Sequence, residues 1–288
     1  MSAHPRVDLH AHTTWSDGTE SVAQLWASAR QAGLTTLALT DHDTVAGWAE
    51  LPAAVEATGV AAVPGIEVSA EHDRLSVHVL ALLVDPCTDT DLARELERAR
   101  DSRVTRAERM VQAISADHPI TWDDVKAQVA GETTTVGRPH IADALVAAGV
   151  VGDRAEAFQR ILHPSGPYYA RYYAPAPAVA VRAILDAGGV PILAHPGSAT
   201  RDGTLPMELL ESMVEAGLAG VEVDHREHSE EARGRLRDFA RTHDLLITGG
   251  SDYHGAGKPN RLGENLTQPD VLDAITSRAT SATEVIRT

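Results

Sequence analysis

Nine side chains that could bind metal ions stand at or near the ends of short apolar runs in this sequence. They are His10, His12, Asp17, His42, Glu67, His78, His195, Asp252 and His254. Imidazole nitrogens and carboxylate oxygens suit first-row divalent ions, which take about four to six ligands each. Nine are too many for one ion, so the set predicts a cluster of two or three ions.

The spacing of the outermost candidates supports this interpretation. His10 and His12 are two residues apart, as are Asp252 and His254. Because residues i and i+2 of a strand point to the same side, each pair could reach one ion. Asp17 follows in a Ser-Asp-Gly turn, where an aspartate is also a common capping residue.

The other four candidates would be costly to bury without a partner. Glu67 lies in the apolar sequence PGIEV, where a carboxylate that bridges two metals avoids the desolvation cost. His42 ends an apolar run, and the Pro-Gly after His195 would leave its imidazole at the end of a strand. His78 alone would more often be a hydrogen-bonded core residue, and only the other candidates favour it as a ligand.

Apolar runs alternate with segments of helical periodicity along most of the chain. The expected strands are Arg6–His10, Thr36–Thr40, Ala61–Val68, Val77–Leu83, Val190–Ala194, Gly220–Val223 and Leu245–Thr248. The expected helices between them are Val22–Ala32, Val45–Ala57, Ala176–Ala187, Pro206–Ala216 and Glu230–His243. This alternation predicts an α/β fold in which parallel strands form an irregular (β/α) barrel, with the ligands at their carboxyl ends.

Two regions depart from this pattern. About eight residues join Ala61–Val68 to Val77–Leu83, too few for a crossover helix, which predicts a hairpin. Residues 100–165 carry none of the nine candidates and contain helical segments, including one near Ile141–Ala148. We interpret them as a small helical insertion domain that caps the barrel, whose domain then comprises residues 1–99 and 166–288.

Composition limits the classes of function. The 288 residues carry a formal charge of −16, which argues against a broad electrostatic grip on nucleic acid, although two or three divalent ions could invert the local sign. The single cysteine, Cys87, suits a reducing compartment. No apolar signal core or membrane-spanning run is present in the sequence, so we expect a cytoplasmic protein with no membrane contact and no obligate protein partner.

Seven segments together resemble the successive motifs of the polymerase and histidinol phosphatase (PHP) superfamily. They are HAHTTWSDGT, LALTDHDTVAGW, PGIEVSAE, VHVLALLVD, GRPHIADALVAAG, AGGVPILAHPG and GGSDYHG. Within the superfamily the chain is most similar to stand-alone metal-dependent phosphoesterases, which include nucleoside 3′,5′-bisphosphate phosphatases and a related 5′-3′ exoribonuclease. The resemblance implies a distorted (β/α)7 barrel that holds three divalent ions, with Mn²⁺ expected before Fe²⁺ or Zn²⁺.

Carried over motif by motif, the resemblance also implies three ligand sets. They are His10, His12, Glu67 and Asp252 for one ion, Glu67, His78 and His195 for a second, and Asp17, His42 and His254 for the third. Such a centre would supply a bridging hydroxide for attack on phosphorus. Neither Cys87 nor a Gly-x-Ser-x-Gly sequence offers a covalent nucleophile.

Six further residues are candidates for the substrate side. His225 or His228 could protonate or orient the leaving group. Arg138 and His140 in the insertion, and Lys258 and Arg261 after the last ligand pair, could hold a second phosphate.

The expected substrate is a small phosphorylated nucleotide, best the 3′-phosphate of a nucleoside 3′,5′-bisphosphate. A 5′-3′ exonuclease acting on short RNA stays open, but aromatic residues make up only 4% of the chain and the net charge is acidic, which disfavours long single-strand tracking. A metal-dependent amidohydrolase would use a similar barrel site, and a non-catalytic module would use the metals only to brace the fold, so both functions also stay open.

Overall fold

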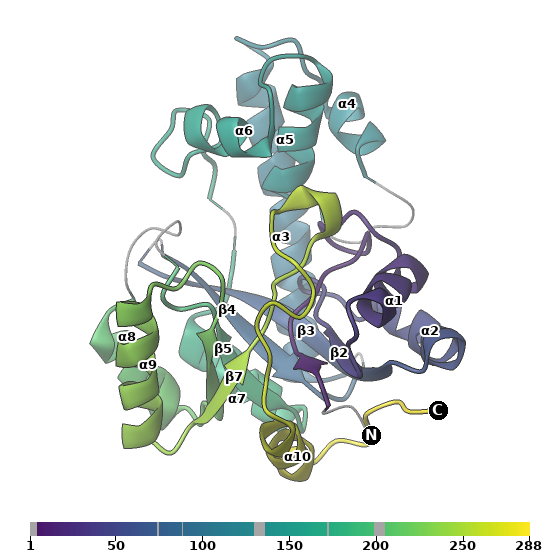
Figure 1. The fold of residues 1–288 in the computed structure, drawn as a ribbon. Helices are drawn as coiled ribbons and strands as arrows, with labels where there is room; N and C mark the ends of the chain where they lie inside the picture. The colour runs from purple at the N-terminus through teal and green to yellow at the C-terminus, as the bar shows by residue number, and fades with distance from the viewer. Residues whose placement is uncertain (1–4, 74, 88, 130–135, 172, 199–204) are drawn as a thin grey trace.

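A seven-stranded sheet curls into a nearly closed barrel, with its strands in the order of the sequence (Figure 1). The structure is a computed structural model that describes residues 5–73, 75–87, 89–129, 136–171, 173–198 and 205–288. The strands are β1 (Val7–Asp8), β2 (Thr36–Leu39), β3 (Ala61–His72), β4 (Leu75–Leu82), β5 (Val190–Ala194), β6 (Gly220–Asp224) and β7 (Leu246–Gly249). This architecture confirms the expected barrel.

One strand runs against the others. β4 pairs antiparallel with both β3 and β5, while the remaining neighbours pair in parallel. The predicted hairpin is therefore confirmed. Beyond the ends of β1 and β7, the His12 amide donates to the Tyr253 carbonyl at 2.8 Å, and this contact brings the first and last ligand pairs together.

Helices lie between the strands and within the insertion where the periodicity predicts them, and the structure adds α10 after the last strand, which was not predicted. They are α1 (Val22–Gln31), α2 (Leu51–Thr58), α3 (Asp91–Ile114), α4 (Trp122–Ala127), α5 (Arg138–Ala147), α6 (Arg154–Arg160), α7 (Pro177–Asp186), α8 (Met207–Glu215), α9 (Glu230–Thr242) and α10 (Pro269–Arg278). Two 3-10 turns, η1 (Ala46–Glu50) and η2 (Gly255–Gly257), complete the set. The single helix expected over Val45–Ala57 is instead η1 followed by α2, because Pro52 lies in the first turn of α2, where its missing N–H costs nothing.

Apolar side chains fill the barrel and seal its lower end. Val63, Leu80 and Ile192 belong to one buried cluster that also includes Leu272 and Ile275 of α10. In Figure 1, α10 lies at the end of the barrel opposite the insertion. With this end closed by apolar packing, the ends of the strands near the insertion are left to carry the polar residues.

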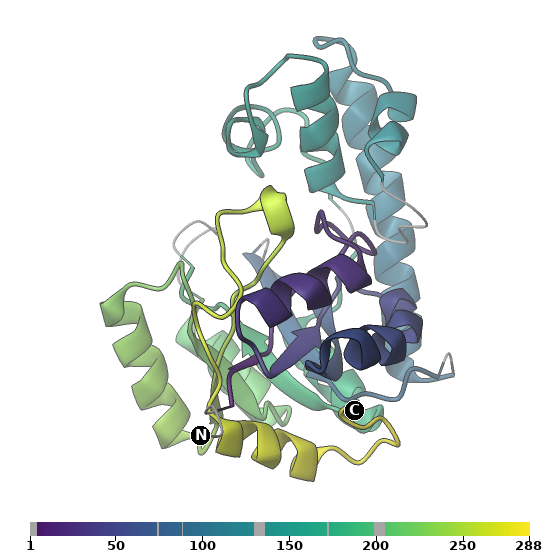
Figure 2. The same cartoon turned by 45° about the vertical axis from the view of Figure 1, so that its right-hand side comes forward.

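The insertion has a hydrophobic core of its own. Met110 and Ile114 of α3 pack with Ile141 and Leu145 of α5 in this cluster. α3 runs from beside the barrel up into the insertion, as Figures 1 and 2 show, so the boundary expected between residues 99 and 100 falls inside one continuous helix. Among the described residues, no helix combines the length and the apolar character that crossing a membrane requires.

Candidate metal centre

The nine predicted ligands converge at the upper end of the barrel. In chain order, His10 and His12 follow β1, Asp17 lies in the loop before α1, His42 follows β2, Glu67 and His78 lie within β3 and β4, His195 follows β5, and Asp252 and His254 follow β7. Because β4 runs antiparallel, its first half is the part that reaches this end, and His78 lies there. The convergence of strand ends thus gathers residues up to 244 positions apart in the sequence.

Five imidazoles surround the carboxylate of Glu67, which is fully buried. The distances between its oxygens and the nearest ring nitrogens are 2.5 Å for His78, 2.9 Å for His195, 3.1 Å for His12, 3.2 Å for His42 and 3.3 Å for His10. Burial acts to raise the pKa of Glu67, but His78, His42 and His10 oppose it and hold the pKa well below its usual range. The ionised Glu67 carboxylate therefore lies at the centre of the histidines, where it could bind more than one metal ion.

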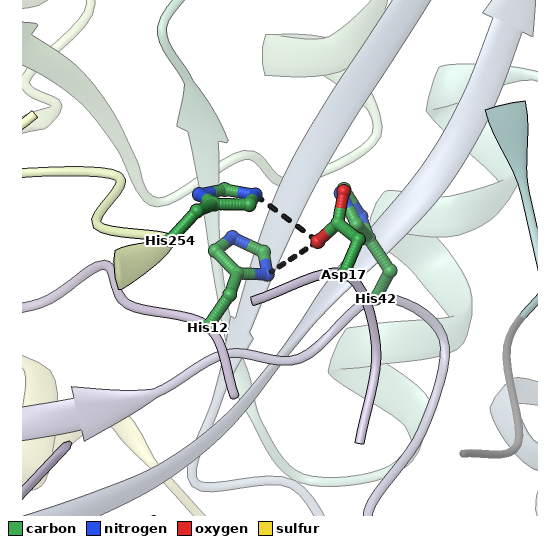
Figure 3. Close-up of side chains that lie close together, drawn as sticks. All are labelled: His12, Asp17, His42 and His254. Carbon is green, nitrogen blue, oxygen red and sulfur yellow. Dashed lines mark ion pairs between the residues drawn. The ribbon is translucent and has the colours of Figure 1, made fainter. Parts of the chain in front are cut away.

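A second carboxylate, Asp17, faces the imidazoles of His12, His42 and His254 (Figure 3). Its oxygens lie 3.1 Å from His254 Nε2, 3.7 Å from His12 Nδ1 and 3.8 Å from His42 Nε2. Burial lowers the pKa of His254 to about 4, and the nearby His12 and Lys258 act in the same direction. At neutral pH this ring is neutral and can offer a lone pair to a metal.

Within the described residues, the ligand atoms form three overlapping groups, each with its atoms within 4.8 Å of one another. The groups are His10, His12, Glu67 and Asp252; His12, Asp17, His42 and His254; and His42, Glu67 and His78. The first group is the set that the resemblance implies for one ion. The second group contains the set that the resemblance implies for Asp17, His42 and His254, with His12 in addition. The third group contains His42 in place of the implied His195, although the His195 ring also lies 2.9 Å from Glu67.

The chemistry of the buried atoms fits divalent ions. His10 Nε2, His12 Nε2, His254 Nε2 and Glu67 Oε2 are buried and make no hydrogen bond of good geometry. Buried polar atoms of this kind need a partner, and an ion between them would provide one. His10 also presents its Nδ1 to the carboxylate of Glu222 at 3.2 Å, which fixes the tautomer that leaves Nε2 as the ligand atom.

Glu222 of β6 is a supporting residue that the sequence analysis missed. Besides His10, it accepts a hydrogen bond from the backbone N–H of His195 at 2.9 Å. His195 has a φ of 32°, a rare conformation for a residue other than glycine, so this bond holds a strained position. Glu222 lies in the strand sequence VEVD, and its signal in the sequence was a carboxylate inside an apolar strand, the same signal that identified Glu67.

A buried aspartate braces the loop between His12 and Asp17. Asp41 accepts hydrogen bonds from the Thr13 N–H at 2.8 Å, from the Thr13 hydroxyl at 2.6 Å and from the Ser16 hydroxyl at 2.6 Å. These bonds tie the Asp17 loop to the end of β2. The loop is thereby held in place by barrel residues on one side.

The two histidines proposed for proton transfer differ in their surroundings. His228 donates from Nδ1 to the Val223 carbonyl at 2.8 Å and accepts from the Gly197 N–H at Nε2 at 3.1 Å, so backbone groups engage both nitrogens. His225 accepts the Glu227 N–H at Nδ1, and its Nε2 lies 3.7 Å from Asp252. Of the two rings, His225 is the one whose proton faces the cluster.

The four predicted phosphate-binding residues are placed at different depths. Lys258 donates from Nζ to Asp252 at 2.7 Å, whereas the Arg261 residue is exposed. Half-buried Arg138 donates to the Leu162 carbonyl at 3.3 Å and lies over the Phe158 ring. His140 is buried, with its Nδ1 accepting from the Gly137 N–H.

Arg154 of α6 is another residue at this end that the sequence analysis missed. It forms a two-pronged ion pair with Asp143, at 2.5 and 2.6 Å, and reaches the Asp17 carbonyl at 3.5 Å. Asp17 and Arg154 are 137 residues apart, and neither local pattern indicates the contact.

Comparison with known proteins supports a phosphoesterase site. A model of the PHP domain family matches residues 8–119. The chain is 32% identical to a 3′,5′-nucleoside bisphosphate phosphatase of Chromobacterium violaceum, over 88% of this chain and 89% of that protein. It is 34% identical to a phosphoribosyl 1,2-cyclic phosphate 1,2-diphosphodiesterase of Eggerthella lenta, over 86% and 94% of the two chains.

Two further matches cover almost the whole chain. A 5′-3′ exoribonuclease of Haemophilus influenzae is 31% identical, over 94% of this chain and 96% of that protein. A solved structure from Bifidobacterium adolescentis, described as a metal-dependent phosphoesterase, is 44% identical with a TM-score of 0.93, covering 97% of this chain and 98% of that chain. The barrel and the insertion are therefore shared together.

Proposed function

The chain belongs to the PHP family and is a metal-dependent phosphoesterase, and on this premise we propose that its substrate is a nucleoside 3′,5′-bisphosphate, from which it removes the 3′-phosphate. The observation that carries this proposal is the cluster of three overlapping ligand groups around Glu67 and Asp17, whose loop the insertion contacts through Arg154. Nine nitrogen and oxygen ligands suit three divalent ions, for which Mn²⁺ is our choice. Such ions would activate a water and offset the charge of the phosphate when bound.

The residues of the chain supply orientation and a hydrogen bond to the leaving group. Glu222 holds the His10 and His195 ligands, and Asp41 holds the loop of Asp17. We assign to His225 a hydrogen bond from Nε2–H to the leaving oxygen, because this nitrogen faces Asp252 in the cluster and the ring is fully buried. His228 would keep the backbone around it in place.

The second phosphate needs a cation that stands outside the ligand cluster. Arg138 meets this condition, because it lies at the start of α5 in the insertion, two residues before His140, whose ring is hydrogen-bonded to the backbone of Ser16. A guanidinium matches two phosphate oxygens at once. Lys258, being paired with Asp252, is better placed to balance charge within the cluster than to hold a distant phosphate.

A 5′-3′ exoribonuclease is the second candidate, favoured by one observation. The Arg138 guanidinium lies over two aromatic rings, 5.3 Å from the centroid of Phe158 and 6.0 Å from that of Tyr169. Rings and guanidinium planes of this kind can stack with bases of a single strand. The acidic charge of the chain favours the shorter substrate.

One assay separates the candidates. Purified protein with Mn²⁺ is given adenosine 3′,5′-bisphosphate, a 5′-phosphorylated RNA trinucleotide, a cyclic phosphodiester or an N-acyl amide at equal concentrations, with chelator-treated protein and the Glu67→Gln variant as controls. We expect the highest kcat/KM for the bisphosphate, with adenosine 5′-monophosphate as the product by mass spectrometry. Faster cleavage of the RNA or the diester would overturn the proposed substrate.

A further inference from the structure

The insertion contacts the upper end of the barrel at the loops that carry one particular ligand group. From this placement we propose that the insertion completes the metal subsite of Asp17, His42 and His254, with Arg103 and Arg154 as its positioning residues. The inference rests on the proposed metal centre and concerns which part of the chain builds one of its subsites. Its consequence is that this ion should depend on the insertion more strongly than the others do.

Arg103 of α3 holds the loop of His42. Its guanidinium lies 3.1 Å from the carboxylate of Asp43, the residue after His42, and both side chains are largely buried, at 12% and 0% exposure. Asp43 has a φ of 53° and accepts the Ser69 N–H at 2.8 Å, and Arg100 donates to its carbonyl at 2.5 Å. A buried charge-assisted contact on a residue in this rare conformation fixes the direction in which His42 leaves β2.

Arg154 of α6 and His140 of α5 hold the loop of Asp17. Arg154 is oriented by the two-pronged pair with Asp143, and its remaining nitrogen donates to the carbonyl of Asp17 itself. His140 adds a hydrogen bond to the backbone of Ser16. Asp41 braces the same loop from the barrel side, so the insertion supplies the opposing support.

The third ligand of this subsite meets the insertion through the turn that follows it. A methyl group at Gly257, three residues after His254, would collide with the guanidinium of Arg154. The Gly257 N–H also donates to the His254 carbonyl at 3.2 Å, which links the turn η2 to the ligand. Arg154 thus lies against the segments of both Asp17 and His254.

Three ligands outside this subsite receive their support from the barrel. Glu222 of β6 holds His10 and His195, and Glu67 extends from the hydrogen-bonded hairpin of β3 and β4. Barrel strands alone thus position these three ligands through the bonds described. Loss of the Arg154 contact should therefore weaken one ion selectively, and loss of the Arg103 contact should weaken the same ion most, although His42 is shared with the group of Glu67 and His78.

The test measures ion binding directly. Wild type and the variants Arg154→Ala, Arg103→Ala and Gly257→Ala are stripped of metal and titrated with Mn²⁺ by calorimetry, and bound Mn²⁺ is counted by mass spectrometry of the dialysed protein. We expect three ions in the wild type, and in Arg154→Ala and Gly257→Ala one ion weakened at least tenfold with two retained. In Arg103→Ala the same ion should be weakened most, with a smaller effect on the ion of Glu67 and His78, because His42 belongs to both groups. Gly257→Ala displaces Arg154 without removing a charge, and Arg154→Lys should restore part of the affinity.

Arg160→Ala is the matched control, since Arg160 lies on the same helix and pairs with Glu156 at the surface. It should bind three ions as the wild type does, and all variants should keep the wild-type circular dichroism. Unchanged affinity for every ion in Arg103→Ala and Arg154→Ala would overturn the inference, as would weakening of all ions alike. A wild type that binds only two ions yet hydrolyses the bisphosphate would overturn this inference and leave the proposed function intact. Selective ion loss in a protein without phosphatase activity would support the inference and refute the proposed function.

Discussion

The upper end of the barrel and the insertion above it bury opposite kinds of side chain. The barrel end buries charge, since Glu67, Glu222 and Asp252 are at most 1% exposed. The insertion buries an apolar core around Met110 and Leu145 and keeps the ion pair of Arg154 with Asp143 partly exposed at its edge. Buried charges are costly unless they are paired or bind metals, and an apolar core has no such requirement.

This difference indicates that the barrel end carries the reaction, whereas the insertion can vary in what it binds. The barrel end can hold a reactive centre because its strands fix the charged groups against one another at short range. The insertion can change its edge residues without disturbing its own core, so it is suited to set substrate and ion preference. Substitutions in the barrel end should therefore affect stability and activity together, whereas substitutions at the edge of the insertion should mainly affect binding.

The largest effect is expected from Glu67→Gln. The amide keeps the shape of the carboxylate but removes the charge that faces five imidazoles, so bound ions lose their shared ligand. We expect kcat to fall by about a thousandfold or more, together with a loss of bound Mn²⁺. Glu71→Gln, farther along the same strand β3, is the control and should retain activity; an active Glu67→Gln would remove the central role of this carboxylate.

The next effect concerns Asp8, a buried barrel carboxyl just before the first ligand pair. Burial raises the pKa of Asp8 to about 6 from 3.8, although the N–H groups of Gly263 and Ser251 oppose the change. Because the folded-state pKa is raised, the folded protein holds the proton more tightly. The contribution of Asp8 to the free energy of unfolding is therefore greatest below pH 3.8 and is lost as the pH rises through about 6.

Chemical denaturation of chelator-treated protein would measure this contribution. The difference in unfolding free energy between wild type and Asp8→Asn should fall by about 2 kcal/mol from pH 4 to pH 7. The variant lacks the titrating group, so changes common to both proteins cancel. A difference that stays constant with pH would show that the burial of Asp8 is tolerated without cost.

A smaller effect is expected from Glu222→Gln. An amide can still accept a hydrogen bond from the His195 N–H but no longer attracts the His10 ring by charge. Supporting carboxylates of this kind typically contribute about 10- to 100-fold in metal affinity or activity. Mn²⁺ titration measures the change, and Glu231→Gln on the exposed face of α9 is the matched control. Affinity equal to the wild type would contradict the support assigned to Glu222.

The smallest effect is expected at the edge of the insertion. Arg138→Ala should raise KM for adenosine 3′,5′-bisphosphate by about tenfold with little change in kcat, because a phosphate contact far from the reacting bond acts on binding. Thermal unfolding should change little, in contrast to the barrel variants. A fall in kcat at unchanged KM would place Arg138 at the reacting phosphate and break the division between barrel and insertion.

Most of the barrel could be predicted from the sequence because its signals are local. Val190–Ala194 forms a strand with the bounds that its apolar run indicates, and the short link after Ala61–Val68 required a hairpin. The lengths of β3 and β4 were underestimated, because β3 continues to His72 through polar residues that only the antiparallel partner stabilises. Pairing between strands, rather than composition, decides such ends.

The candidate metal ligands could be predicted from the sequence, but most of the residues that hold them in place could not. A histidine or carboxylate at a strand end is visible as an exception in an apolar pattern, and the nine residues of this kind do meet at one end of the barrel. Glu222 carried the same signal and was overlooked. Arg103 and Arg154 carry no signal, because each is one of many charged residues on a helix with a polar face.

The sequence by itself determined the chemistry of this protein, since side-chain type and position along a strand set which groups can bind metals and which end of the barrel they reach. Only the tertiary structure decided that Glu67 lies at the centre of five imidazoles and that Arg154 supports Asp17 from another part of the chain. The physical reason is the distance along the chain over which each kind of interaction acts. Periodicity and turn formation act over a few residues, whereas these contacts depend on how the strands close into a barrel and where the insertion rests on it.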